Sequence, residues 1–254
     1  MYVITHKKFE YNLSDGYTPL LVGADFNPNP MGYLCDNTGD NISSSNKSFC
    51  ELTGMYWLWK NCTDRYIGIS HYRRYFSDKP NLNMVRLEAL LSNAPRVIST
   101  QKLDSYLESY DWIVPQEEAV SGDRLTVYEQ FSDAHNIEDL EKAKKIIQKL
   151  YPEYIEAFNE VMTNTKMSKF NMLYTSKKQY DNYCEWLFKI LFSLEKQTDI
   201  STYDEYQQRL YGFIAERLLN VWIEKNDVKV KKLPVFNTSL ENRHGVIDKI
   251  KSKF

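Results

Sequence analysis

The sequence predicts one α/β domain built on a mostly parallel sheet. Three observations support this fold class: short β-rich runs alternate with amphipathic helical segments, neither an internal repeat nor a low-complexity linker divides the chain, and 254 residues suit one substantial domain. In sheets of this kind, ligands bind beyond the carboxyl ends of the strands. We therefore look for a functional site in the loops that follow strands.

Two strands and a long polar loop are expected near the start of the chain. Residues 2–5 are a short β-rich run that stops at a polar trio. Residues 20–24 are a second run, and the sequence Asn27-Pro-Asn-Pro breaks the chain behind it. Residues 36–46 are almost entirely polar, which indicates a loop.

A helix and a third strand follow this loop. Ser48 and Glu51 have the spacing of a capping box, in which both side chains satisfy free N–H groups at the start of a helix. Residues 66–70 form the third strand, which runs straight into the segment 71–76. The apolar residues behind the capping box recur on one helical face: Leu52, Met55, Tyr56 and Trp59.

The rest of the chain continues the alternation of strands and helices. Strands are expected at 112–114, where Pro115 closes the run, at 170–175 and, as an alternating edge strand, at 228–235. Apolar residues at helical spacing predict helices at 139–151, after Pro152, at 179–194 and at 212–224.

Composition excludes several classes of protein. The chain has 32 Lys and Arg against 34 Asp and Glu, a net charge of −2, which argues against a nucleic-acid binder that relies on overall positive charge. No run of 18 apolar residues predicts a membrane span, and the first residues lack the apolar stretch of a signal peptide. Four cysteines without metal-ligand spacing are expected to be reduced thiols in the cytoplasm. The motifs of P-loop NTPases, zinc proteases and serine hydrolases are absent.

Aromatic residues are unusually abundant, with 19 Tyr, 12 Phe and 5 Trp. They could simply fill the core and the half-buried surface. They also suit a cleft that handles sugars, because each ring offers a flat apolar face and some carry a polar tip.

The segment after the third strand is the most informative. His71, Arg73 and Arg74 place three hydrogen-bond donors at a predicted strand end, and arginine pairs with phosphate oxygens through two parallel bonds. The two arginines could equally form ordinary ion pairs in solvent. An anion site and a solvated surface pair both remain open.

Two further residues are candidate general bases. Glu216 lies early in the helix 212–224, where its side chain and that of Arg217 point in different directions. His135 lies between a loop and a helix. The ordinary alternatives are an exposed helix charge and a capping segment. His6 and Lys7 resemble the arginine segment more weakly, and Lys7 could simply face solvent.

Residues 243–254 form a basic amphipathic tail, in which apolar residues at helical spacing alternate with lysines. Such a segment could rest on an anionic membrane surface. It could equally be a terminal helix docked on the domain.

Several blocks of residues, in this order, resemble a glycosyltransferase family that is found in bacterial capsular and exopolysaccharide gene clusters and has long been labelled a domain of unknown function. The resemblance covers almost the whole chain. The blocks are Thr5-His6-Lys7, Asp36-Asn-Thr-Gly-Asp-Asn-Ile-Ser43, Asn46, Glu51-Leu-Thr-Gly-Met-Tyr-Trp-Leu-Trp-Lys-Asn61, Gly68-Ile-Ser-His-Tyr-Arg-Arg-Tyr-Phe76, Asn171-Met172 and Gly212-Phe-Ile-Ala-Glu-Arg-Leu218.

The resemblance implies a fold and an activity. The fold would be GT-A-like, a Rossmann-type nucleotide-sugar-binding sheet flanked by helices, with a donor-binding half at 1–115 and an acceptor and catalytic half at 116–242. The activity would be hexosyl transfer, of galactose or galactofuranose, from a UDP-sugar to a lipid-linked glycan. The enzyme would be cytoplasmic or peripheral on the inner face of the plasma membrane.

The resemblance also implies roles for individual residues. Many GT-A enzymes hold a divalent metal with an Asp-x-Asp motif after a strand like 66–70, where this chain has His71-Tyr-Arg-Arg. We therefore expect Arg73 and Arg74 to replace the metal, with the UDP-sugar as co-substrate and no other cofactor. Glu216 would be the general base, with His135 in reserve. The remaining expected contacts are Thr5, His6 and Lys7 to the nucleotide, His71 to the substrate, Asn41 and Asn46 in the donor pocket, and Asn171 near the transferred sugar.

Two rival functions fit the same residues. A non-catalytic carbohydrate- or nucleotide-binding protein would use the aromatic residues and the arginines without needing Glu216. A phosphate-ester hydrolase would use the arginines and release phosphate without a glycan product.

Overall fold

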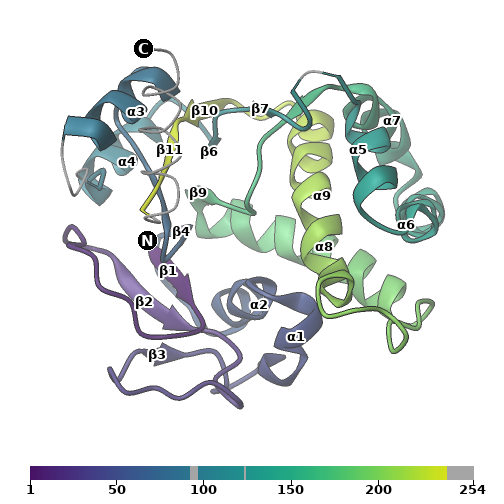
Figure 1. Cartoon of the computed structure of the whole chain (residues 1–254), viewed down its shortest axis with the longest axis horizontal. Coiled ribbons are helices and arrows are strands. Elements are labelled where there is room, and N and C mark those ends of the chain that lie inside the picture. Colours follow the sequence, from purple (N-terminus) through teal and green to yellow (C-terminus); the bar gives the residue numbers. More distant parts are fainter. Residues whose placement is uncertain (92–96, 123, 239–254) are drawn as a thin grey trace, which may run out of the picture.

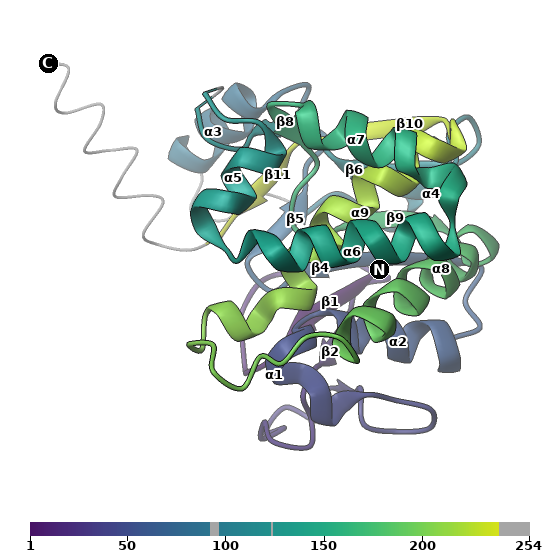
Figure 2. The same cartoon turned by 90° about the vertical axis from the view of Figure 1, so that its right-hand side faces the viewer.

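A central sheet runs through the molecule, and helices cover both of its faces (Figures 1 and 2). The structure is a computed structural model and describes residues 1–91, 97–122 and 124–238. The main path of the sheet has the strand order β10-β6-β9-β4-β1-β2-β3. These strands are β1 (Tyr2–Thr5), β2 (Thr18–Leu21), β3 (Leu34–Cys35), β4 (Tyr66–His71), β6 (Trp112–Pro115), β9 (Leu173–Ser176) and β10 (Val230–Leu233).

Neighbouring strands on this path are parallel, except that β9 runs antiparallel to both β4 and β6. The expected α/β fold is therefore confirmed, with a mixed sheet in which four of the six pairings on this path are parallel. Two shorter strands extend the sheet beyond β4: β5 (Arg74–Phe76) pairs with β4 and with β11 (Val235–Asn237), both antiparallel. A separate antiparallel pair joins β7 (Glu118–Ala119) to β8 (Lys166–Met167).

The strands form where the sequence has short apolar runs, because a parallel sheet is buried on both faces. All four residues of β1 are buried, and the side chains of the first three alternate between two clusters. Tyr2 and Ile4 join the largest core cluster, and Val3 joins a smaller one on the other face. In β6, Trp112 and Ile113 divide in the same way.

The helices differ in which face of the sheet they cover. Helices α2, α6, α7, α8 and α9 contribute to the largest core cluster, whereas α3 and α4 pack on the opposite face. The helices are α1 (Asn46–Phe49), α2 (Leu52–Asn61), α3 (Leu82–Leu91), α4 (Thr100–Tyr106), α5 (Val127–Ala134), α6 (Ile137–Leu150), α7 (Ile155–Thr163), α8 (Lys177–Glu195) and α9 (Leu210–Asn226), with short 3-10 turns η1 (Ser43–Ser45), η2 (Pro152–Tyr154) and η3 (Gln207–Arg209).

The capping box expected at Ser48 and Glu51 is wrong. Ser48 already lies inside α1, and its hydroxyl donates to the carbonyl of Ser45. Cys50 has a left-handed backbone (φ 50°), which separates α1 from α2. Glu51 precedes α2, but its side chain makes no capping bond there. The Glu51 carboxylate is therefore available for another use.

Other boundaries shift for local reasons. Strand β9 begins at Leu173 instead of residue 170, because Phe170 and Asn171 both have left-handed backbones (φ 78° and 49°) that no strand accommodates. Pro234, which cannot donate to a strand ladder, separates β10 from β11. The sequence did not predict α3, α4 and α5. The tail at 243–254 lies outside the described residues.

Among the described residues, no helix combines the length and the apolar character that crossing a membrane requires.

Candidate functional site

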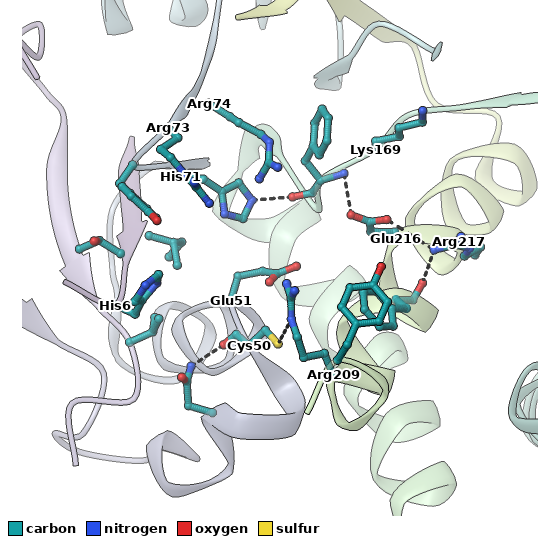
Figure 3. Close-up of a pocket in the computed structure, with 18 of the residues that line it drawn as sticks. His6, Cys50, Glu51, His71, Arg73, Arg74, Lys169, Arg209, Glu216 and Arg217 are labelled. Carbon is teal, nitrogen blue, oxygen red and sulfur yellow. Dashed lines mark hydrogen bonds and ion pairs between the residues drawn. The ribbon is translucent and has the colours of Figure 1, made fainter. Parts of the chain in front are cut away.

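A cavity of about 590 Å³ opens at the carboxyl ends of β1 and β4 (Figure 3). One wall comes from the sheet, through residues that follow these strands and through the β4–β5 turn. The opposite wall comes from the start of α9 and the segment before β9. The floor includes the junction of α1 and α2. This is the edge at which strand-end reasoning places a site.

Most of the site residues expected from the sequence lie together in this cavity. Lys7, Asn41 and Asn171 are not part of its lining. Their roles, like those of the residues in the cavity, remain predictions. The expected residues that do line the cavity are Thr5, His6, Asn46, His71, Arg73, Arg74, His135 and Glu216.

The three expected residues outside the lining have local contacts instead. Lys7 closes a tight turn after β1, in which the Thr5 hydroxyl donates to its carbonyl and accepts from its N–H group. Asn41 forms a turn of its own, donating to Gly39 and accepting from the N–H of Ser43. Asn171 is 1% exposed and reaches the site only through its contacts.

The cavity is positively charged, although the chain as a whole carries −2. Burial lowers the pKa of His6, His71 and His135 below the ordinary 6.5, so these rings are neutral near pH 7. The charge therefore comes from other side chains, five basic against two acidic. They are Arg73, Arg74, Lys169, Arg209 and Arg217, against Glu51 and Glu216.

Arg73 and Arg74 are placed by the tight turn between β4 and β5, in which His71 pairs with Arg74. The Arg73 guanidinium lies 4.9 Å from the centre of the Tyr72 ring, and that of Arg74 lies 4.5 Å from the Phe170 ring. Neither arginine forms an ion pair with a carboxylate in the described part of the chain. Both guanidinium groups therefore line the cavity without a direct ion pair to a described carboxylate.

Glu216 and Arg217 both line the opposite wall, but they differ in their exposure and in their hydrogen-bond partners. The Glu216 carboxylate accepts from the N–H of Phe170 at 3.0 Å, and its side chain is 24% exposed. Arg217 is buried and donates to the carbonyl of Phe213, the amide oxygen of Gln130 and Glu216. Burial raises the pKa of Glu216, and the nearby charge of Glu51 acts in the same direction. A raised pKa makes an ionised carboxylate a better proton acceptor.

The left-handed turn at Phe170 and Asn171 joins the two walls. The Phe170 N–H donates to Glu216, and its carbonyl accepts from Nε2 of His71 at 2.6 Å. Because a carbonyl oxygen can only accept, neutral His71 carries its proton on Nε2. The same peptide segment therefore orients a carboxylate on one wall and an imidazole on the other.

A buried carboxylate holds the floor of the cavity. Asp36 is fully buried and accepts four hydrogen bonds, from the N–H groups of Gly23 and Ala24 and the hydroxyls of Ser43 and Thr53. These bonds fasten the loop after β2 to the start of α2. Asn46 adds to this network, donating to the Thr53 hydroxyl at 3.0 Å.

Gly23 occupies a position in this network that has no room for a side chain. A Cβ atom at this position, where φ is +60°, would lie 2.6 Å from Oδ1 of Asn46. The loop after β2 therefore approaches the start of α1 more closely than any other residue type permits.

His135 belongs to an aromatic group beside the cavity. Its ring stacks on Phe213, with the ring centres 4.1 Å apart, and Nδ1 hydrogen-bonds to Gln207. Tyr206, which is 54% exposed, stacks on the other side of this group. A partly exposed aromatic surface at the mouth of a cavity is suited to packing against the apolar face of a sugar ring.

Sequence reasoning assigned no site role to four charged residues of the lining, which are Glu51, Lys169, Arg209 and Arg217. Glu51 stood in a recognised block but was interpreted as a helix cap. Arg209, which donates through Nε to Cys50 Sγ at 3.4 Å, ends the short turn η3, and Lys169, which donates to the Ala119 carbonyl, follows β8. Neither carries a spacing signal, because tertiary packing alone brings them to the cavity.

No group of three or more His, Cys, Asp or Glu side chains is arranged as a metal site within residues 1–91, 97–122 and 124–238.

Comparison with known proteins places the chain in a family. A solved structure described as the apo form of the bifunctional glycosyltransferase WbbM matches with a TM-score of 0.81 and 30% identity, covering 94% of this chain and 45% of that chain. This chain thus spans about half the length of that protein. No curated protein matches the chain. The fold is the expected GT-A-like sheet flanked by helices. The model of a family described as a domain of unknown function, DUF4422, matches residues 1–227. The family expected from the sequence blocks is thereby confirmed, and the chain belongs to DUF4422.

Proposed function

We propose that the protein is a glycosyltransferase that moves a sugar from a nucleotide-sugar donor to a glycan acceptor. One observation carries this proposal: at the carboxyl edge of a GT-A-like sheet, guanidinium groups without an ion-pair partner among the described residues face the partly exposed Glu216 carboxylate across one cavity. The match to a solved bifunctional glycosyltransferase supports it.

The arginines are suited to binding the donor diphosphate. Arg73 and Arg74 lie after β4, and Arg209 reaches the cavity from the opposite wall. Arginine pairs with phosphate oxygens in a planar fork, and it stays charged at any physiological pH. We propose that these groups take the place of a divalent metal and neutralise the charge that grows on the leaving UDP. Preorganised groups of this kind lower a barrier by about 3 kcal/mol each.

Glu216 is suited to the role of general base. In the transfer step, the acceptor hydroxyl oxygen forms a bond to the anomeric carbon, the bond from that carbon to the diphosphate oxygen breaks, and the hydroxyl proton passes to the Glu216 carboxylate. The Phe170 N–H fixes one carboxylate oxygen. His135 is the second candidate, since it lines the same cavity and its ring is neutral near pH 7.

The finer assignments follow from the family resemblance. We propose a UDP-linked galactose or galactofuranose as the donor and a lipid-linked glycan of capsular or exopolysaccharide assembly as the acceptor, at the inner face of the membrane. Thr5 and His6, at the end of β1, would contact the nucleotide, and Asn46 would line the donor pocket, as the lining of the cavity supports.

Release of UDP tests the proposal. The protein is incubated with a panel of UDP-sugars, with and without a glycan acceptor, and in the presence and absence of EDTA. We expect acceptor-dependent UDP release that EDTA does not change. Arg73→Ala and Arg74→Ala should each lower kcat by about a hundredfold. Arg65→Ala, an exposed arginine outside the cavity, is the matched control and should have no effect.

Other results would contradict parts of the proposal. Strict dependence on Mn²⁺ or Mg²⁺ would refute the role of the arginines in place of a metal. Binding of a UDP-sugar without turnover would indicate a non-catalytic binding protein. Release of phosphate without a glycan product would indicate a hydrolase.

A further inference from the structure

We infer that Glu51 is a second substrate-facing carboxylate, which accepts a hydrogen bond from a hydroxyl of the transferred sugar, and that Asn171 positions it. The inference rests on the proposed function and adds a residue that recognises the sugar of the donor. It begins from the backbone. The left-handed Cys50 interrupts the helical path between α1 and α2, and the next side chain turns into the cavity (Figure 3).

Asn171 holds the Glu51 carboxylate from behind. Its Nδ2 donates to Oε1 of Glu51 at 2.6 Å and to the carbonyl of Gly212 at 3.2 Å, so both of its N–H bonds are used. Asn171 has φ 49°, a conformation that asparagine tolerates better than most residues with a side chain. Its own Oδ1 is buried and has no partner among the described residues, which costs free energy. The two groups to which Asn171 donates therefore set the orientation of its side chain, and the bond to Glu51 is the shorter of the two.

The second carboxylate oxygen of Glu51 remains open to a ligand. In the part of the chain that the structure describes, Oε2 takes part in no hydrogen bond or ion pair. Glu51 also does not cap its own helix. A carboxylate that is fixed through one oxygen and free at the other presents a preorganised acceptor to the cavity.

Chemistry selects the part of the donor that Glu51 contacts. A diphosphate has only acceptor oxygens at neutral pH, so a carboxylate repels it, whereas sugar hydroxyls donate. The uracil and ribose also carry donors, but the surroundings of Glu51 favour the sugar end. Consecutive residues hold the two carboxylates, since the Phe170 N–H donates to Glu216, the proposed base, and Asn171 donates to Glu51. The carboxylate that accepts the acceptor proton must lie beside the reacting carbon, and Glu51 lies near it.

Calorimetry of UDP and UDP-sugar binding tests whether Glu51 contacts the transferred sugar or the rest of the donor. The probes are UDP and whichever member of a UDP-sugar panel the wild-type protein binds most tightly. In Glu51→Gln, affinity for the UDP-sugar should fall by at least about tenfold, the value of one hydrogen bond to a charged group, while affinity for UDP should not fall, because the change removes a negative charge that repels the diphosphate. Arg74→Ala should weaken both ligands. Glu153→Gln, an exposed glutamate on η2, should change neither.

Asn171→Gly tests the positioning role, because glycine keeps the left-handed backbone and removes only the amide. It should lower the ratio of UDP-sugar to UDP affinity in the same direction as Glu51→Gln. A general loss of folding would not change this ratio selectively.

Three results would overturn the inference in distinguishable ways. If the wild-type protein binds UDP and a UDP-sugar and Glu51→Gln leaves the ratio unchanged, the role of Glu51 is refuted while the proposed function stands. If Glu51→Gln lowers the ratio and Asn171→Gly does not, the positioning role of Asn171 is refuted. If the wild-type protein binds neither ligand, the proposed function fails and this inference with it.

Discussion

Replacing Asp36 with asparagine should destabilise the fold more than any other single isosteric change at the floor of the cavity. The Asp36 carboxylate accepts from backbone N–H groups of Gly23 and Ala24 at 3.0 and 3.1 Å and from the hydroxyls of Ser43 and Thr53 at 2.5 Å. Each carboxylate oxygen takes one N–H and one hydroxyl. Asparagine keeps only one acceptor oxygen.

The size of the effect follows from this arrangement. Whichever way the amide is turned, its NH₂ group faces one backbone N–H that cannot rotate away, while the hydroxyl beside it can turn and accept. One buried donor is therefore left unpaired, at about 1–3 kcal/mol, and the surviving bonds lose the contribution of the charge. We expect Asp36→Asn to lower the free energy of unfolding by about 3–5 kcal/mol, a large fraction of the total for a typical domain.

Urea unfolding followed by tryptophan fluorescence measures this change. A loss of that size should lower the midpoint by about 1–2 M urea. Asp25→Asn is the matched control, because that carboxylate is exposed and accepts one bond, from Asn37. It should shift the midpoint by less than about 0.3 M. Equal midpoints for Asp36→Asn and the wild-type protein would refute the account of Asp36 as the fastening point of the floor.

Three further predictions concern Arg209 in the cavity wall, Gly68 in the sheet and Glu216, the proposed general base. Arg209→Ala should weaken UDP binding by about tenfold in calorimetry, because its guanidinium fork faces the proposed diphosphate site; unchanged affinity would exclude Arg209 from that site. Gly68→Ala should lower the free energy of unfolding by about 1–3 kcal/mol, since a Cβ atom would lie 2.2 Å from the Tyr174 ring, whereas Gly212→Ala, with no neighbour closer than 3.8 Å, should not destabilise. Burial raises the pKa of Glu216 above 4.5, so the folded protein binds this proton more tightly than the unfolded chain. Wild-type stability should therefore fall as pH rises from 4.5 through the raised pKa, and kcat should fall as pH drops through it. The urea midpoint of Glu216→Gln should lack this dependence on pH. Parallel plots of midpoint against pH for the variant and the wild-type protein would contradict the assignment.

The fold could be predicted from the sequence wherever local pattern and tertiary burial agree. The runs that became β1, β4 and β6 are apolar because the sheet is covered on both faces, and α6, α8 and α9 show a clear helical period. The prediction of helix capping failed in two places. Thr126 and Glu129 form a capping box at the start of α5, which was not predicted, while Ser48 and Glu51 share the spacing without forming one.

The difference between these two pairs is a tertiary contact. The carboxylate of Glu51 bonds to Asn171, which lies 120 residues further along the chain, and no local pattern reports that bond. The site shows the same division. Strand-end reasoning places His71, Arg73 and Arg74 at the cavity, because the topology of a parallel sheet fixes where strands end. Arg209 reaches the same cavity only through packing of η3 against α1, which the sequence does not encode in any short spacing.

The left-handed turn before β9 also limits how members of this family can be recombined. Phe170 is a single residue whose N–H serves Glu216 and whose carbonyl serves His71, so one peptide segment is a shared part of both walls. A chimera that joins the first 115 residues of one protein to the remainder of another takes this turn and the histidine that it contacts from different proteins. Differences between relatives are therefore better exchanged by grafting exposed residues beside the cavity, such as Tyr206, than by swapping halves of the chain.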